Sequence, residues 1–407
     1  MTKATDTGRR SGIVRPIAIV ISGIVLMWLS LAVTLAMSAS ASSPAVVLSL
    51  WPSAAMAKTA ASWNLVNGTP TLRDQEAAAA MAGSALSREP VLADAASTLG
   101  AIFDLRGQIA RADIAFGVAE RLSRRELRAQ LWFIERAVQR GDIDGALRHY
   151  DIALRIKPSS AALLLPVLVQ ASDDPLIRRP LMVRLRSKPD WRLSYLRAML
   201  TTPPGPAAIA DQIAHTGLDP ASDADRRILS DGLDHLVRMG QYHLAAATLP
   251  RTRLTGPTTI RNGGFEDAPA LLPFDWWLNT ETDLSAYREP SRLGDGGYVL
   301  RISSENRGGQ VARQLTVLSP GQYTINGIAG TNPDTGGAMP VLTVICADTQ
   351  KTLATKTPTT TLRTPFALAF VVPPIGCVAQ WIGIDTSPGS SVSAWMDALR
   401  LQSTAIR

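Results

Sequence analysis

The sequence predicts a multidomain α + β protein: an amino-terminal transmembrane helix, an array of α-helical hairpins and a carboxyl-terminal antiparallel β-sandwich. Three observations predict this order. Residues 16–37 carry no charge, and residues 72–249 repeat apolar side chains at three- and four-residue spacing. From about residue 256, short apolar runs alternate with turns rich in Gly, Pro, Thr and Asn.

The composition excludes several classes of protein. Apolar residues make up 46% of the 407 residues and charged residues 18%, which excludes a disordered, collagen-like or coiled-coil chain. Two cysteines exclude a cysteine-rich zinc module. The net charge of +7 is spread along the chain, so we expect no nucleic-acid partner.

The uncharged residues 16–37 are long enough to span a hydrocarbon core of roughly 30 Å as a helix. Basic residues dominate the preceding segment, and the positive-inside rule therefore places residues 1–15 in the cytoplasm and the bulk of the chain outside. A cleaved signal peptide is the alternative, because Ala39-Ser40-Ala41 and Ala55-Met56-Ala57 both fit a cleavage site. The apolar stretch is long for a signal peptide, which favours a retained anchor.

Residues 38–71 are rich in Ala and Ser and are interpreted as a linker. Residues 72–255 form the predicted helical domain, which contains a repeat of 34 residues aligning 93–126 with 127–160. In this alignment Gly107 falls on Gly141, Ala112 on Ala146, Phe116 on Tyr150 and Ala119 on Ala153. Small residues at such positions let two antiparallel helices approach closely.

This pattern resembles tetratricopeptide repeats, in which a Leu-Gly pair, a turn Gly, Ala, an aromatic residue and a closing Pro recur. Leu99-Gly100 is present only in the first unit, and Pro158 closes only the second. The resemblance implies stacked helical hairpins whose surface binds a partner protein. The alternative is a rigid spacer without a ligand.

Residues 256–404 form the predicted strand-rich domain. Seven candidate strands are separated by strong turns, and this number over about 145 residues favours a sandwich. The candidates are residues 297–303, 310–318, 322–329, 341–347, 365–372, 377–384 and 391–401.

The order of landmarks in this domain is more specific than the strand count. The domain opens with Asn262-Gly263-Gly264-Phe265-Glu266 and Asp275-Trp276-Trp277, and it closes with Ala394-Trp395-Met396-Asp397. It resembles jelly-roll carbohydrate-binding modules and related galactose-binding-like domains over residues 260–401.

Sugar-binding sites stack an aromatic ring on the apolar face of a sugar and reach its hydroxyls with polar side chains. The candidate glycan-binding residues are Trp276, Trp277, Asp275, Tyr287 and Arg288. Because Trp276 and Trp277 are adjacent, an extended segment would point them to opposite sides, one buried and one exposed. Trp381 and Trp395 lie inside candidate strands and are expected in the core.

The resemblance also implies a structural calcium ion between the opening Glu and an Asp of the last strand, here Glu266 and Asp397. Oxygen ligands of this kind suit calcium, but two carboxylates are far from a full site, and two solvated acids are the alternative. Cys346 and Cys377 both fall in candidate strands. They form a disulfide in an oxidising compartment or remain two buried thiols.

No nucleophile elbow, phosphate loop or zinc helix occurs in the sequence, so we expect no catalytic residue. The sequence favours a non-catalytic protein of a bacterial inner membrane, with a single span and the bulk in the periplasm. The helical repeats would bind a protein and the jelly roll a glycan, in assembly or export of a surface polysaccharide. A purely structural scaffold and a polysaccharide-modifying enzyme are the alternatives.

Overall fold

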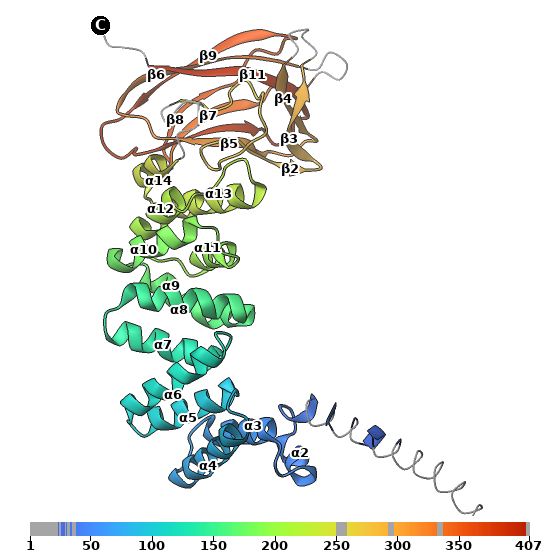
Figure 1. The fold of residues 1–407 in the computed structure, drawn as a ribbon. Coiled ribbons are helices and arrows are strands. Elements are labelled where there is room, and N and C mark those ends of the chain that lie inside the picture. The colour runs from blue at the N-terminus through green and yellow to red at the C-terminus, as the bar shows by residue number, and fades with distance from the viewer. Residues whose placement is uncertain are drawn as a thin grey trace, which may run out of the picture. The chain divides into compact units, whose positions relative to one another are not determined.

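The computed structural model of the chain describes residues 38–249, 259–291, 297–331 and 337–403, together with residues 23, 26–28, 30, 33 and 34. The chain divides into two compact units, Met1–Ser160 and Ala161–Arg407 (Figure 1). Most of the predicted anchor, residues 16–37, lies outside the described residues. Within the part of the chain that is described, no helix has both the length and the apolar character needed to cross a bilayer.

The first unit consists of helices. They are α2 (Pro44–Leu50), α3 (Ala55–Val66), α4 (Leu72–Arg88), α5 (Ala93–Leu105), α6 (Ile109–Leu122), α7 (Leu127–Gln139) and α8 (Ile143–Ile156), followed by the short η1 (Pro158–Ser160). Helix α4 begins at a capping box in which Thr71 and Asp74 satisfy each other's backbone N–H groups. The strongest amphipathic pattern in the unit belongs to α7 and α8.

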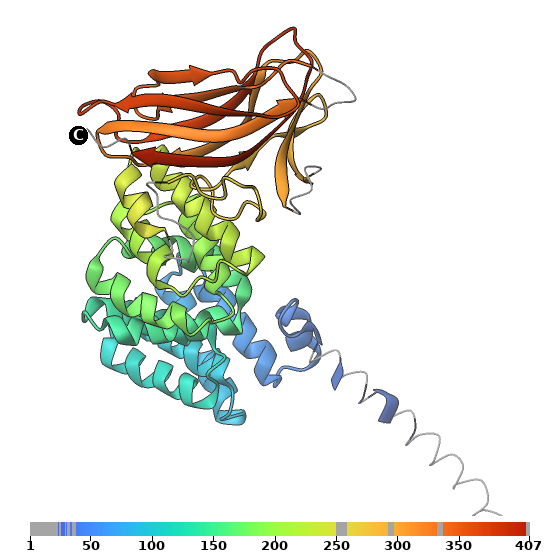
Figure 2. The same cartoon turned by 90° about the horizontal axis from the view of Figure 1, so that it is seen from above.

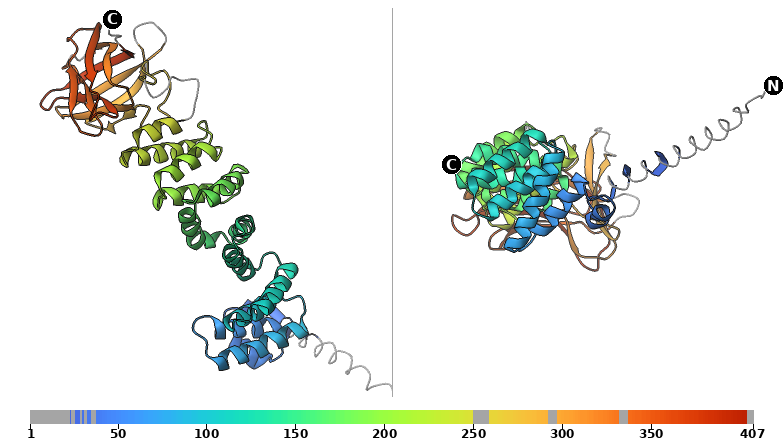
Figure 3. Two further views of the ribbon diagram at one scale, coloured as in Figure 1. Left: turned by 90° about the vertical axis from the view of Figure 1, so that its left-hand side faces the viewer. Right: turned by 60° about the horizontal axis from the view of Figure 1, so that its bottom comes forward.

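Two helical hairpins occupy the two repeat units that the sequence predicts (Figure 3, left). Gly107 joins α5 to α6 and Gly141 joins α7 to α8; their φ angles are positive, at 68° and 69° respectively. That region of backbone conformation suits glycine because it has no Cβ. Phe116 packs against Gly100 of the partner helix and stacks on Trp132 with ring centroids 4.8 Å apart. The hairpins are present, whereas membership of the tetratricopeptide family stays a prediction.

The helical region begins before the point that the sequence predicts. Residues 38–71, interpreted as a linker, contain α2 and α3, and α3 packs on α4. Ala55 is buried with Ala85 of α4 and Ala95 of α5. An Ala-rich composition is typical of tethers, but alanine side chains also allow helices to pack closely, and here they do so.

The second unit starts with further helices: α9 (Ala161–Ala171), α10 (Pro175–Arg186), α11 (Arg192–Thr201), α12 (Pro206–His215), α13 (Asp223–Arg238) and α14 (Tyr242–Thr248). A buried ion pair joins Arg192 of α11 to Asp225 of α13 at 3.2 Å. The Ser230 hydroxyl of α13 donates to the Ala270 carbonyl and accepts from the Leu272 N–H, each at 3.2 Å. These helices belong to the same compact unit as the strands. The boundary that the sequence predicts at residue 255 lies outside the described residues.

The strands form two antiparallel sheets in face-to-face layers, with β6, β9 and β11 in one layer and β5, β7 and β8 in the other (Figures 1 and 2). The five-stranded sheet has the order β1-β5-β10-β7-β8, and the six-stranded sheet has the order β2-β3-β4-β11-β6-β9. The strands are β1 (Trp277–Leu278), β2 (Thr280–Glu281), β3 (Leu284–Pro290), β4 (Tyr298–Ser304), β5 (Gly309–Thr316), β6 (Gly321–Thr331), β7 (Val341–Cys346), β8 (Thr352–Lys356), β9 (Thr364–Val372), β10 (Gln380–Thr386) and β11 (Val392–Ser403).

All seven predicted strands are present, with ends shifted by a few residues. The sequence did not predict β1, β2, β3 and β8, which are short or rich in polar residues. The apolar residues of both sheets meet in one core, which includes Trp276, Leu300, Ile325, Ile382 and Ile384. Side chains alternate along each strand, so every second residue points into this core and the residues between them lie on the outer faces of the sheets.

Candidate functional site

The strongest candidate site lies on the outer face of the five-stranded sheet. Strand β5 pairs with β1 and β10, so that Arg313 lies opposite both Trp277 and Gly383. Ile382 and Ile384 of β10 point into the core, which leaves Trp381, Gly383 and Asp385 on the outer face. We call this surface the aromatic platform; it comprises Trp277, Gln310, Arg313, Thr343, Trp381 and Asp385.

Two indole rings flank one guanidinium on the platform. The Arg313 Cζ lies 5.4 Å from the ring centroid of Trp277 and 4.8 Å from that of Trp381. Trp277 is 36% exposed and Trp381 is half-buried. The expectation that Trp381 belongs to the core is therefore wrong, because the register of β10 places it on the outer face. Trp395 is buried as expected, at 6% exposure.

A cluster of polar side chains lies beside the rings, around Gly383. The Thr343 hydroxyl donates to Asp385 Oδ2 at 2.8 Å. A Cβ added at Gly383 would lie 2.7 Å from Thr343 Oγ1 and 2.9 Å from Gln310 Nε2, so only glycine lets these side chains converge. Burial raises the pKa of Asp385, while hydrogen bonds from Thr343 and Gln310 oppose that rise. The platform thus offers donors and acceptors next to apolar ring surface.

The structure separates the glycan-binding candidates predicted from the sequence. Trp276 and Trp277 point to opposite sides, as expected, and Trp277 alone of the five reaches the platform. Trp276 is fully buried against Phe265, with ring centroids 5.5 Å apart. Asp275 is also buried and accepts from the backbone N–H groups of Ala270 and Trp276. Both residues therefore support the fold and are not available to a ligand.

Tyr287 and Arg288 lie in β3 of the six-stranded sheet. Tyr287 is 47% exposed and faces away from the platform. Arg288 stacks on Tyr298 at 4.3 Å and donates from Nε to the Phe265 carbonyl at 2.6 Å and from Nη2 to the Glu266 carbonyl. Arg288 thus fastens the opening loop of the sandwich to a strand of the other sheet, apart from the platform.

The two candidate calcium ligands approach each other near Gly264. A Cβ added at Gly264 would lie 3.8 Å from Asp397 Oδ1 and 3.9 Å from Glu266 Oε1. Glu266 Oε1 accepts from the Tyr298 N–H at 3.2 Å, and Asp397 Oδ1 accepts from the Ala398 N–H at 2.5 Å. The two carboxylates come from opposite ends of the sandwich sequence and fit the oxygen chemistry of calcium.

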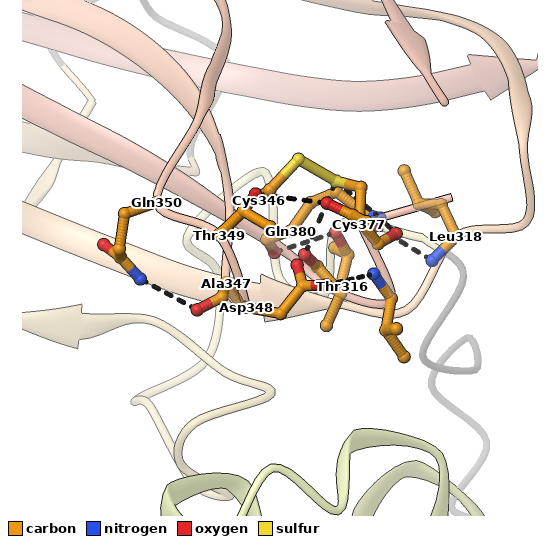
Figure 4. The surroundings of a disulfide bond; sticks show 12 residues. Thr316, Leu318, Cys346, Ala347, Asp348, Thr349, Gln350, Cys377 and Gln380 are labelled. Atoms are coloured by element: carbon orange, nitrogen blue, oxygen red, sulfur yellow. Dashed lines mark hydrogen bonds between the residues drawn. A yellow bond between two sulfur atoms is a disulfide. The ribbon is translucent and has the colours of Figure 1, made fainter. Parts of the chain in front are cut away.

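The two cysteines form a disulfide with Cα atoms 5.0 Å apart (Figure 4). It joins the end of β7 to the segment before β10. Gln380 Nε2 donates to the Cys377 carbonyl at 3.0 Å, and Gln380 Oε1 accepts from the Leu318 N–H at 2.9 Å. Asp348 lies beside both sulfur atoms, but bonded sulfurs offer no thiolate to a metal.

A hollow with a volume of about 580 Å³ lies in the first unit. Its wall includes Trp63 and Arg128. The Arg128 Cζ lies over the Trp63 ring, 4.5 Å from its centroid. Arg128 also pairs with Glu126, with Nε and Oε1 2.7 Å apart. A hydrogen bond with Glu126, together with burial, raises the pKa of Asp94 to about 6. The hollow combines apolar wall with charges of both signs.

Comparison with known proteins gives no family. No family model matches the chain, and no curated protein matches it. The structural neighbours of the antiparallel β-sandwich include carbohydrate-binding modules. One is described as "CBM4 structure and function", at 16% identity and a TM-score of 0.29, covering 36% of this chain and 99% of the other.

Two further neighbours are the CBM22-1 xylan-binding domain of Paenibacillus barcinonensis Xyn10C and TmCBM61 in complex with beta-1,4-galactotriose. The first has 10% identity and a TM-score of 0.29, covering 39% of this chain and 100% of the other. The second has 14% identity and a TM-score of 0.26, covering 35% and 96%. With TM-scores this low, none of these similarities says what the present chain binds.

The sequence analysis missed most of the platform. Arg313, Gln310, Thr343 and Asp385 were not proposed as site residues, and Trp381 was assigned to the core. One signal was available in β10, where Trp381, Gly383 and Asp385 alternate with two isoleucines. That alternation predicts a polar outer face, but the sequence does not say which strands lie beside it.

Proposed function

We propose that the β-sandwich is a jelly-roll carbohydrate-binding module and that it binds glycan on the aromatic platform. One observation carries the proposal: two tryptophan rings and four hydrogen-bonding side chains share one face of a sheet. An aromatic ring contributes apolar contact to the C–H face of a sugar, and neighbouring polar groups fix the hydroxyls. Rings on a rigid sheet lose little conformational freedom when a ligand binds.

Affinity electrophoresis of the full chain through gels that contain neutral or acidic polysaccharides tests this proposal. Trp277→Ala should weaken retardation by about tenfold, which corresponds to ~1.4 kcal/mol of lost ring contact. Tyr287→Ala removes an exposed aromatic ring from the other sheet and is the matched control. The proposal fails if no polysaccharide retards the wild type, or if both variants weaken retardation equally.

We propose that the module does not act as an enzyme. Glycoside hydrolysis ordinarily needs a pair of carboxyl groups flanking the scissile bond. Among the described residues of the platform, Asp385 is the one carboxyl group, and it is held by Thr343. The wild type should form no product from any polysaccharide, and Asp385→Asn should change affinity alone. Product formation by the wild type that Asp385→Asn abolishes would refute this assignment.

We propose further that residues 16–37 anchor the protein in a bacterial inner membrane and that both folded units lie in the periplasm. The charge asymmetry around the uncharged stretch supports this topology. The Cys346–Cys377 disulfide also supports it, because such bonds persist in oxidising compartments. Added protease should cut the sandwich in spheroplasts and spare it in intact cells; protection in both would place it in the cytoplasm.

The helical repeats, which we propose to be tetratricopeptide-like, would bind a partner protein of polysaccharide assembly or export. The hollow bounded by Trp63 and Arg128 supports this role, since mixed apolar and charged walls suit a polypeptide segment. Trp63→Ala should release the partner that co-purifies with the wild type. Ile114→Ala removes an exposed apolar side chain from outside the hollow and is the control.

We propose that Glu266 and Asp397 hold a structural calcium ion. Bound calcium would stabilise the opening loop of the sandwich against the last strand without taking part in chemistry. A chelator should lower the unfolding temperature of the wild type and leave that of Glu266→Gln unchanged. Equal unfolding temperatures with and without chelator in the wild type would exclude the ion.

A further inference from the structure

Arg313 differs from two other arginines of the sandwich, which pair with carboxylates. Arg301 pairs with Glu289, with Nε and Oε2 2.6 Å apart, and Arg307 pairs with Glu281 and Asp283. Arg313 is exposed, and no carboxylate of the described residues pairs with it. Within the described residues, this positive charge of the platform therefore has no carboxylate partner.

The Arg313 guanidinium lies over two indole rings. A cation above an aromatic ring is attracted to the ring face, and both Trp277 and Trp381 lie within 6 Å of the Arg313 Cζ. The five N–H donors of a guanidinium point outward in its plane, in a fork that matches an oxyanion. Within the described structure no side-chain hydrogen bond of Arg313 uses these donors, so they are free for a ligand.

The carboxyl group on the same face does not serve as the missing partner. Asp385 lies two residues beyond Gly383, the residue paired with Arg313. Its oxygen accepts from Thr343 at 2.8 Å, and Gln310 also hydrogen-bonds to it. These bonds hold the Asp385 carboxyl between Thr343 of β7 and Gln310 of β5, and no ion pair joins it to Arg313 among the described residues.

We infer that the glycan is acidic and that Arg313 binds an oxyanion on it, a uronate carboxylate or a sulfate ester. This inference rests on the proposed function of the platform and names the class of its ligand. The exposed ring of Trp277 contacts the sugar, while the in-plane N–H groups of Arg313 form paired, charge-assisted hydrogen bonds to the oxyanion. A neutral glycan would leave this cation unpaired.

Calorimetric titration of the full chain in detergent tests the inference with three oligosaccharides of one length and linkage. The probes are an oligouronate, its carboxyl-reduced neutral form and a sulfated form of the neutral chain. The charged probes should bind at least tenfold more tightly than the neutral one. Arg313→Gln should weaken only the charged probes, roughly ten- to hundredfold, the range expected for losing hydrogen bonds to a charged group. Raising the salt concentration should have the same selective effect.

Two further variants sharpen the test. Arg313→Lys keeps the charge but loses the planar fork, and it should recover only part of the affinity. Arg363→Gln removes an exposed arginine from the loop before β9 and should change nothing. Whichever charged probe binds more tightly identifies the oxyanion.

The outcomes separate this inference from the function on which it rests. Equal binding of neutral and charged probes, or an equal loss for all three in Arg313→Gln, would overturn the acidic ligand and leave glycan binding intact. If none of the probes, and no polysaccharide in the gels, binds the wild type, both statements fail.

Discussion

Breaking the Cys346–Cys377 bond should cost the sandwich a large part of its stability. The bond closes a chain segment of 31 residues between β7 and β10, which are neighbours in the five-stranded sheet. In the chain-entropy treatment, a loop of this length restricts the unfolded state by about 4 kcal/mol. For a folded unit of this size, that corresponds to a fall of about 10 °C in unfolding temperature.

The assay is thermal unfolding of the full chain, followed by tryptophan emission with and without a reducing agent. The chain has two cysteines, so reduction acts on this bond alone. A variant with both Cys346→Ala and Cys377→Ala should unfold at the temperature of the reduced wild type and should not respond to reductant. If labelling shows two free thiols and the unfolding temperature of the wild type is unchanged, the loop-closure reasoning is refuted.

Two predictions concern the first unit. Gly100→Ala would place a Cβ 2.8 Å from the Phe116 ring and should cost about 1–3 kcal/mol in denaturant unfolding. Gly117→Ala would place a Cβ 3.6 Å from the Arg121 side chain, an ordinary van der Waals contact, and should be neutral or slightly stabilising; equal effects would disprove the close approach. The pKa of Asp94, raised to about 6, means that the folded state holds a proton that the unfolded state releases. The stability that Asp94 contributes is therefore full at low pH and falls between about pH 4 and pH 6. Asp94→Asn should remove this decline from unfolding curves, whereas Asp113→Asn, an exposed control, should retain it.

The local patterns along the chain were enough to predict most of the elements. Turn glycines such as Gly107 and Gly141 marked the hairpins because their backbone conformation excludes most side chains. Alternating apolar residues marked seven strands, since each must place every second side chain in a shared core. Short polar strands such as β2 and β8 carry too little of this pattern to be recognised.

Adjacent residues with opposite environments were also predictable. Trp276 and Trp277 had to diverge in an extended segment, and the structure buries the first and exposes the second. The alanine-rich residues 38–71 show the limit of composition, because the same residues suit a tether and a closely packed helix. Only the neighbouring surface of α4 decides between them.

The sequence by itself determined the succession of a helical part and a strand-rich part, and the pairing of small and aromatic residues within the hairpins. These follow from periodicity, which depends on residues close together in the chain. The tertiary structure alone decided the platform, because β1, β5, β7 and β10 are far apart in sequence and meet only through the order of the sheet. Strand order and register determine which side chains lie beside Arg313. Both arise from the packing of the whole core, so local spacing in the sequence does not encode the neighbours of Arg313.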